Sequence, residues 1–399
     1  MRVLAALSGG VDSAVAAARA VDAGHEVTAV HMALSSNPQS CRVGARGCCS
    51  LEDSVDAARA AEVLGIPYYV WDLAEEFEQT VVEDFVEQYR MGRTPNPCVR
   101  CNEFVKFREL AIRAKALGFD AVCTGHYARI ENHNGYQLLR ARDLDKDQSY
   151  VLAVMGSEEL ARVILPLGDV GSKDEVRAEA AERGLGVSQK PDSYDICFIP
   201  DGDTQGFLRA KLGESSGDIV DVEGNVLGQH RGYFEYTVGQ RKGLGIDRPA
   251  ADGKPRYVLE THPQSNQVVV GPSTLLSVND IEAGELVWLA ADDAGDVRTL
   301  EPHAMGTDGD EALYAQMRAH GKPQLIEELT VTDGPLAGGT ASASGIEKTR
   351  QANRNETGGG NVRIKLSETV RGIAAGQSLV IYRGNRILAH SVINTASRS

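Results

Sequence analysis

A short glycine-rich segment near the start of the chain constrains the fold most strongly. Residues 2–7, which are apolar from Val3 onward, predict a buried strand that runs directly into Ser8-Gly9-Gly10-Val11-Asp12-Ser13. The Ala-rich residues 13–23 then predict a helix that ends at Gly24. A loop between a buried strand and a helix N-terminus brings glycine amides together, and this geometry binds phosphate oxygens. The sequence therefore indicates an α/β domain whose first loop binds a nucleotide.

The pattern of this loop also excludes common nucleotide-binding classes. The Walker pattern of Gly, four residues and Gly-Lys-Ser/Thr is absent, and so is Gly-x-Gly-x-x-Gly. The loop instead resembles that of N-type ATP pyrophosphatases, which cleave ATP between the α and β phosphates and leave AMP on an acceptor oxygen. Such chemistry needs Mg²⁺ to offset charge on the departing pyrophosphate, and Asp12 is a candidate to help place it. A capped Gly-Gly turn without function explains the six-residue pattern less well.

The pattern of apolar residues and glycines changes at two places along the sequence, and these two changes predict three domains. Over about the first 125 residues, apolar runs alternate with helical stretches, which is typical of a parallel sheet covered by helices. After about residue 200, glycine-punctuated segments such as residues 232–239 predict short strands. From about residue 280, inward and outward side chains alternate as in a small barrel or sandwich.

We therefore expect an α/β pyrophosphate-loop domain with an N-terminal parallel sheet (residues 1–204), a central β-rich domain (205–279) and a C-terminal β-barrel (280–399). Residues 332–361 are dense in Gly, Ser, Thr and Asn, with few apolar residues to offset the entropy of ordering them. A mobile surface insertion is expected there.

The seven cysteines all lie in the first 197 residues, and their number is odd. A secreted fold built on disulfides would not show this distribution. No apolar run approaches the roughly 20 residues that a membrane span needs, so we expect a cytoplasmic protein without a membrane anchor. Clustered cysteines then point to metal binding or thiol catalysis, except for Cys123, whose apolar surroundings predict core burial.

Two cysteine segments are candidates for chemistry. Cys98 and Cys101 form a Cys-x-x-Cys pattern that is predicted to lie in a proline-fixed loop, with a helix beginning near residue 103. A cysteine beside a helix N-terminus and Arg100 should favour the thiolate. Cys-x-x-Cys is more often half of a zinc site, but the adjacent pair Cys48 and Cys49 is a poor second half. Cys197, in the second segment, has no nearby cysteine in the sequence.

Taken together, these segments resemble the tRNA-specific 2-thiouridylases over essentially the whole chain. The resemblance rests on ordered segments: residues 8–13, Asn96-Pro97-Cys98-Val99-Arg100-Cys101-Asn102, Gly125-His126-Tyr127-Ala128-Arg129, Asp145-Lys146-Asp147-Gln148-Ser149-Tyr150 and Ile196-Cys197-Phe198-Ile199. The formal charge of −15 argues against non-specific coating of nucleic acid, but it allows selective tRNA binding through local patches.

The resemblance implies a thiolation reaction at the wobble uridine of tRNA. In that family ATP converts the C2 oxygen into an adenylate, and sulfur then displaces AMP. By resemblance, Cys197 carries a persulfide, and Cys101 attacks it, which liberates sulfur and leaves a Cys101–Cys197 disulfide. A sulfur-relay protein or a cysteine desulfurase would supply the persulfide sulfur.

The resemblance also implies three sets of binding residues. The ATP set is Ala6, Leu7, Ser8, Gly9, Gly10, Val11, Asp12, Ser13, Met32 and Gly125. The residues that meet the target base are Asn96, Pro97 and Cys98. Further tRNA contacts fall on His126, Lys146, Asp147, Gln148, Arg318, Ala319 and Gln377. For His126 the competing interpretation is a structural histidine at a strand end, and Ala319 stands where the family usually has an aromatic residue.

Cys98 is the main departure from the family pattern, which most often has an aspartate there. With Cys101 and Cys197 it makes a three-cysteine set that could hold a [4Fe-4S] cluster with one open iron. Two further hypotheses stay open. One is an ATP-dependent amide or guanidino ligase, and the other is a non-catalytic nucleotide-binding module with a structural zinc.

Overall fold

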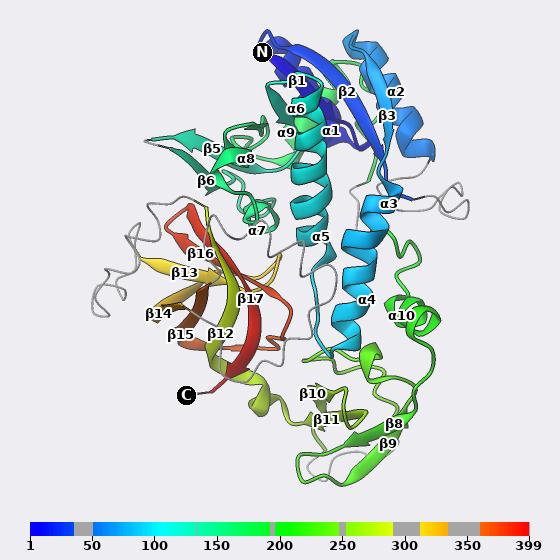
Figure 1. Cartoon of the computed structure of the whole chain (residues 1–399), viewed down its shortest axis with the longest axis vertical. Coiled ribbons are helices and arrows are strands. Elements are labelled where there is room, and N and C mark those ends of the chain that lie inside the picture. The colour runs from blue at the N-terminus through cyan, green and yellow to red at the C-terminus, as the bar shows by residue number, and fades with distance from the viewer. Residues whose placement is uncertain are drawn as a thin grey trace. The chain divides into compact units, whose positions relative to one another are not determined.

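The computed structural model describes residues 1–35, 51–133, 135–191, 196–246, 253–289, 312–333 and 360–398 (Figure 1). The chain forms two compact units. The first comprises Met1–Val82, Pro97–Gly202 and Asn385–Leu388, and the second comprises Glu83–Asn96, Asp203–Gly384 and Ala389–Ser399. Within the described ranges, every helix is too short or too polar to cross a membrane.

A parallel sheet forms the centre of the first unit. Its strand order is β3-β2-β1-β4-β7, and every pairing between neighbours is parallel. The strands are β1 (Arg2–Ala6), β2 (Glu26–Ala33), β3 (Tyr68–Asp72), β4 (Ala121–Cys123) and β7 (Val163–Ile164). The chain moves outward from β1 through β2 to β3 and returns to the other side of β1 at β4. This reversal places a topological switch point between β1 and β4, where α/β sheets bind ligands beyond the carboxyl ends of the strands.

Helices α1 (Val11–Asp22), α2 (Leu51–Leu64) and α9 (Lys173–Glu182) accompany this sheet. The Ala-rich α1 is buried along most of its length, because its small side chains pack closely against the strands and α9. Arg19 of α1 donates to Glu179 of α9 across 2.6 Å. The expected parallel sheet with covering helices is therefore confirmed.

The first unit also holds a hairpin and several short helices. Strands β5 (Ala128–Asn132) and β6 (Tyr136–Arg140) pair antiparallel. The helices are α3 (Ala74–Phe77), the π-helix η1 (Glu78–Val82), α5 (Pro97–Arg100), the π-helix η2 (Cys101–Glu109), α6 (Leu110–Ala116), α7 (Ser149–Leu152) and α8 (Ser157–Leu160).

The helix that carries Cys98 and Cys101 begins earlier than the sequence indicated. Segments α5, η2 and α6 form one continuous helix, because the junction residues Arg100 and Leu110 have helical backbone angles. The predicted start near residue 103 is wrong. Pro97 explains the difference, since its fixed φ suits the first helical position, where its missing N–H costs nothing.

The second unit begins with helix α4 (Glu83–Arg90) and contains α10 (Thr204–Leu212) and a sheet of order β10-β11-β8-β9. These strands are β8 (Gly217–Val220), β9 (Val226–His230), β10 (Tyr257–His262) and β11 (Gln267–Gly271). The 3-10 turns are η3 (Tyr233–Glu235) and η4 (Ser273–Leu276). The expectation of a strand over residues 232–239 is therefore wrong. The ring of Phe234 folds back over Gly232, where a Cβ would lie 2.3 Å from its ring, so the chain turns.

The last part of the second unit is a closed antiparallel barrel. Its order is β12-β15-β14-β13-β16-β17, and β17 pairs again with β12. The strands are β12 (Ser277–Trp288), β13 (Leu313–Gln316), β14 (Gln324–Asp333), β15 (Gly360–Arg371), β16 (Ser378–Arg383) and β17 (Arg386–Ser397). Closure leaves these six strands no free edge along the ring.

The predicted fold class is confirmed: a parallel-sheet domain, a small β-rich region and a β-barrel. The domain boundaries at residues 204 and 279 stay predictions. The predicted insertion at residues 332–361 lies largely outside the described residues, which resume at the start of β15.

Candidate active site

The loop after β1 has a backbone shape that requires glycine. Gly9 has a φ of +78°, and a Cβ there would lie 2.3 Å from the carbonyl oxygen of Asp53. Ser13 Oγ donates to the Gly10 carbonyl at 3.0 Å and accepts from the Ser8 amide at 3.1 Å, which closes the loop. Gly10 is the N-cap of α1, and no side chain caps this helix. Its first-turn amides therefore face the loop, as anion binding requires.

The other residues predicted to bind ATP lie at the carboxyl ends of the parallel strands, as the loop after β1 does. Gly125 follows β4, and a Cβ there would lie 2.6 Å from the backbone of Asp12 and Ser13, so glycine is needed for this close approach. Met32 lies near the end of β2, and the Leu7 amide donates to the Val30 carbonyl at 2.8 Å. The structure thus brings residues 6–13, Met32 and Gly125 to the switch point of the sheet.

Two lysines that sequence reasoning missed contact this loop. Lys190 Nζ donates to the Gly9 carbonyl at 3.0 Å, to Asp53 at 2.8 Å and to Asp56 at 2.7 Å. Burial alone would lower the pKa of Lys190, but the hydrogen bonds to the two carboxylates raise it above its ordinary value. The second lysine, Lys173, pairs with Asp12. Neither contact could be predicted from a sequence pattern, because both lysines are far from the loop along the chain.

The cysteines of the first unit differ in exposure. Cys98 is exposed on α5, Cys101 at the start of η2 is 6% exposed, and Cys197 is half-buried. All are thiols in this structure. Cys123 lies in the core as predicted, where burial raises the pKa of its thiol to about 12. Cys41, Cys48 and Cys49 fall outside the described residues.

The residues next to Cys101 and Cys197 in the sequence make contacts that fix these two segments. The Arg100 guanidinium donates to Glu103 at 2.8 Å, and the Asn102 amide donates to the Val151 carbonyl at 3.0 Å. Phe198 packs edge-on against Phe77, with ring centroids 5.9 Å apart.

The described residues do not gather three His, Cys, Asp or Glu side chains in a group that fits a metal ion. Cys98, Cys101 and Cys197 therefore do not form a ready cluster site in this structure. The same finding gives the zinc hypothesis no support within the described part of the chain.

The surroundings of His126 disfavour the charged form of its ring. Its Nδ1 lies 2.9 Å from Thr124 Oγ1, and its ring packs against Phe107 with centroids 5.7 Å apart. Burial, and next the positive charge of Lys106, hold the pKa of His126 well below its ordinary value. The ring can therefore hydrogen-bond or stack without carrying charge.

Hydrogen bonds to Asp147 fix the conformation of the segment Lys146–Gln148. The Asp147 carboxylate accepts from Arg140 Nε, the Ala141 amide and the Ser149 hydroxyl, each at 2.9 Å. Its side chain is only 4% exposed, so Asp147 organises this turn from the inside. Gln148 is exposed, Lys146 is half-buried, and Gln148 Oε1 accepts from the Tyr127 amide at 3.0 Å.

Arg318, Ala319 and Gln377 lie in loops of the second unit. Arg318 donates to the Arg371 carbonyl at 2.8 Å, and Gln377 accepts from the Ala374 amide at 3.1 Å. The Ala319 carbonyl accepts from Gln316 at 3.1 Å. In the loop after β15, the Ala375 carbonyl accepts a hydrogen bond from the Thr94 amide at 2.7 Å. The structure thus brings this loop close to the residues that lead into Asn96.

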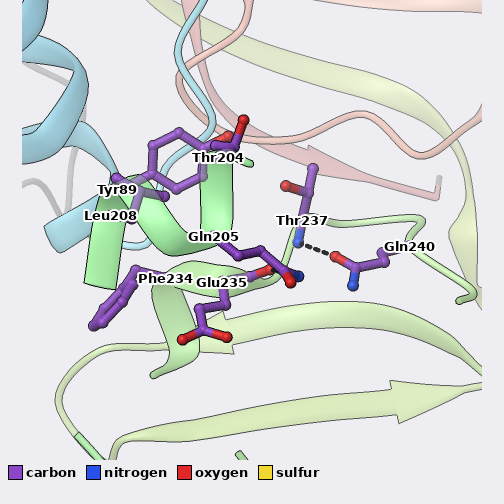
Figure 2. Close-up of a pocket in the computed structure, with 8 residues that line it drawn as sticks. All are labelled: Tyr89, Thr204, Gln205, Leu208, Phe234, Glu235, Thr237 and Gln240. Carbon is purple, nitrogen blue, oxygen red and sulfur yellow. Dashed lines mark hydrogen bonds between the residues drawn. The ribbon is translucent and has the colours of Figure 1, made fainter. Parts of the chain in front are cut away.

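A small pocket in the second unit has no predicted site residue in its lining (Figure 2). Its volume is about 240 Å³, and its lining is Tyr89, Thr204, Gln205, Leu208, Phe234, Glu235, Thr237 and Gln240. Several of its polar groups already bond to one another or to a neighbour. Thr237 N donates to Gln240 at 3.1 Å, and Gln205 donates to the Glu235 carbonyl at 2.9 Å.

Comparison with known families gives matches along most of the chain. Residues 1–201 match the "tRNA methyl transferase HUP domain", residues 205–272 the "tRNA methyl transferase PRC-barrel domain" and residues 347–393 the "Aminomethyltransferase beta-barrel domain".

Individual relatives are similar over nearly their full length. A protein from Beutenbergia cavernae named tRNA-specific 2-thiouridylase MnmA is 56% identical over 100% of this chain and 96% of the relative. A Streptomyces avermitilis protein of the same name is 52% identical with the same coverage. A Kocuria rhizophila protein, also of that name, is 52% identical over 99% of this chain and 98% of the relative.

The close approach of Gly125 to α1 yields a test of the nucleotide loop. Gly125→Ala should weaken binding of an uncleavable ATP analogue by at least ~10-fold, because the new methyl group must displace the first turn of α1. Gly186→Ala is the matched control, since a Cβ at Gly186 meets open space. Calorimetric titration measures both. Equal affinity in the two variants would contradict the assignment.

The neutral ring of His126 yields a prediction for stability against pH. Below about pH 6.5 the unfolded chain binds a proton on this ring that the folded chain does not bind. The free energy of unfolding is therefore unaffected by protonation of His126 above that pH and decreases as the pH falls below it. His126→Gln should therefore reduce the loss of unfolding free energy between about pH 7.5 and pH 5.5. Urea titrations at both pH values measure this loss. An unchanged loss would show that His126 is not held neutral.

Proposed function

The chain belongs to the tRNA-specific 2-thiouridylase family, and we propose that it is a cytoplasmic tRNA-uridine 2-sulfurtransferase that thiolates the wobble uridine in an ATP-dependent reaction. One observation carries the proposal. The phosphate-binding loop, Cys101 and Cys197 all belong to the same compact unit. A chain of this family with an adenylation site and two thiols in one unit has both halves of the chemistry that the reaction needs.

The nucleotide half of the proposed reaction uses the switch point of the sheet. ATP would bind with its phosphates at the uncapped N-terminus of α1, where Gly9 and Gly10 let backbone amides approach. Met32 and Gly125 would complete the site. A bound Mg²⁺ would offset charge on the departing pyrophosphate, and Asp12 supplies a carboxylate at the loop that fits this role. The C2 oxygen of uridine would take the AMP and become a good leaving group.

The sulfur half uses the two thiols. A sulfur-relay protein or a cysteine desulfurase would load Cys197 with a persulfide. The Cys101 thiolate would attack the Cys197 sulfur and form a Cys101–Cys197 disulfide, with hydrosulfide as the leaving group. Hydrosulfide would attack C2 of the adenylated uridine and displace AMP, and a thiol reductant would restore the two cysteines. Cys101 is buried and Cys197 is half-buried, so both thiols are partly shielded from solvent.

The tRNA contacts would come from several loops, since the chain as a whole is acidic. Asn96, Pro97 and Cys98 would meet the target base. His126, Lys146 and Gln148 would contact tRNA beside them, with Asp147 shaping that turn. Arg318, Ala319 and Gln377 would contribute from the second unit. A neutral, partly accessible histidine suits contact with an unpaired base, because such bases stack on rings and bond through their edges.

Three alternatives predict a different product or a different metal content. A [4Fe-4S] version would use Cys98, Cys101 and Cys197, and anaerobically purified protein would then contain iron and labile sulfide; absence of both removes this version. The family models carry a methyl transferase name, and methyl transfer would add the mass of a methyl group to tRNA instead of replacing oxygen by sulfur. An amide or guanidino ligase would release pyrophosphate with an amine and without tRNA.

Loss of either reactive thiol should abolish thiolation. Cys101→Ser and Cys197→Ser should each lower 2-thiouridine in tRNA by more than ~100-fold, because a hydroxyl can neither carry nor attack a persulfide. Mass spectrometry of digested tRNA measures the product. Cys123→Ser is the control, since that thiol is buried and protonated, and it should retain activity if the chain folds. Normal 2-thiouridine in either of the first two variants would refute the persulfide mechanism.

A further inference from the structure

Helices α1 and α9 of the first unit pack against each other, and Arg19 of α1 donates to Glu179 of α9. Three ion pairs connect them at successive levels: Asp12 with Lys173, Arg19 with Glu179 at 2.6 Å, and Asp22 with Arg183 at 2.5 Å. Residue numbers rise together on both helices, so the helices are parallel. The first level therefore places the start of α9 beside the nucleotide loop.

Lys173 has the wrong charge for its position in α9. It is the first residue of the helix, and a helix N-terminus carries partial positive charge that favours anions. Asp174 and Glu175 follow this preference, and Ser172 caps the helix by accepting from the Glu175 amide. Lys173 instead adds a positive charge close to a second helix N-terminus, that of α1. A local rule broken beside a ligand site points to a functional role.

The surroundings of Lys173 direct its ammonium group toward the loop. Lys173 Nζ donates to one carboxylate oxygen of Asp12 and lies 5.7 Å from the ring centroid of Tyr127. Tyr127 is itself fixed, because its hydroxyl donates to the other Asp12 oxygen at 2.6 Å and its amide donates to Gln148. The Lys173 side chain is only 12% exposed. A long flexible side chain is thus held at the mouth of the phosphate loop.

We propose that Lys173 is a phosphate-binding residue of the nucleotide site, which rests on the proposed ATP-dependent function. Without nucleotide, Lys173 neutralises Asp12. When ATP binds, the ammonium group donates to phosphate oxygens instead, which frees the Asp12 carboxylate for the metal ion. The uncapped N-terminus of α1 and the Lys173 ammonium group then face the phosphates, and Tyr127 keeps Lys173 and Asp12 in place through this exchange.

Calorimetric titration of the full chain with α,β-methylene ATP and with adenosine, both in EDTA, tests this assignment. Lys173→Met should weaken binding of the analogue by roughly 10- to 100-fold, the usual worth of a charged hydrogen bond, and should leave adenosine binding unchanged. Lys173→Arg should keep most of the affinity for the analogue. Arg183→Met removes an ion pair between the same two helices at their far end, so it should change neither titration.

A double variant separates direct phosphate contact from simple neutralisation of Asp12. If Lys173 only cancels the Asp12 charge, Asp12→Asn in the Lys173→Met background will restore binding of the analogue. The proposal predicts no restoration. Restoration, equal losses for the analogue and adenosine, or no loss for either would each overturn it. A wild-type chain that binds no ATP analogue would instead refute the proposed function.

Discussion

The contact between Gly125 and the first turn of α1 is the constraint on which the nucleotide site depends. It joins the end of β4 to the start of the helix that follows β1, at a spacing that leaves no room for a side chain. Gly9 adds a second such contact, with the backbone of α2 at Asp53. Together they hold the loop between two strands at the switch point of the sheet. The uncapped α1 N-terminus, Asp12 and the two lysines take their positions from this packing.

The sequence predicted the elements whose signals are local. The run from strand to loop to helix is continuous over residues 2–22, and residues 362–366 of β15 alternate between buried and more exposed side chains, so both were recognisable. The alternation predicted for β16 is wrong, because that strand is buried along almost its whole length. The start of α5 was misplaced because Pro97 was interpreted as part of a loop, although a proline equally suits the first helical residue. Residues 232–239 looked like a strand, but the packing of Phe234 over Gly232 turns the chain.

The parts that were missed depend on contacts between distant residues. Lys190 and Lys173 reach the loop from more than 160 positions away, as the separations of 181 to Gly9 and 161 to Asp12 show. A lone lysine in a helical or loop stretch carries no pattern that marks such a contact. Residues 83–96 likewise belong to the second unit while their neighbours in sequence belong to the first. Only the folded chain contains this information.

The account joins ATP cleavage to tRNA as the acceptor, and one measurement tests that link directly. Pyrophosphate release should be followed with purified chain, ATP, Mg²⁺ and a persulfide donor, with and without unmodified tRNA, while 2-thiouridine is counted in the same samples. The account predicts that pyrophosphate release requires tRNA and matches the 2-thiouridine formed, mole for mole. Release that is independent of tRNA, or ADP and phosphate in place of AMP and pyrophosphate, would contradict it.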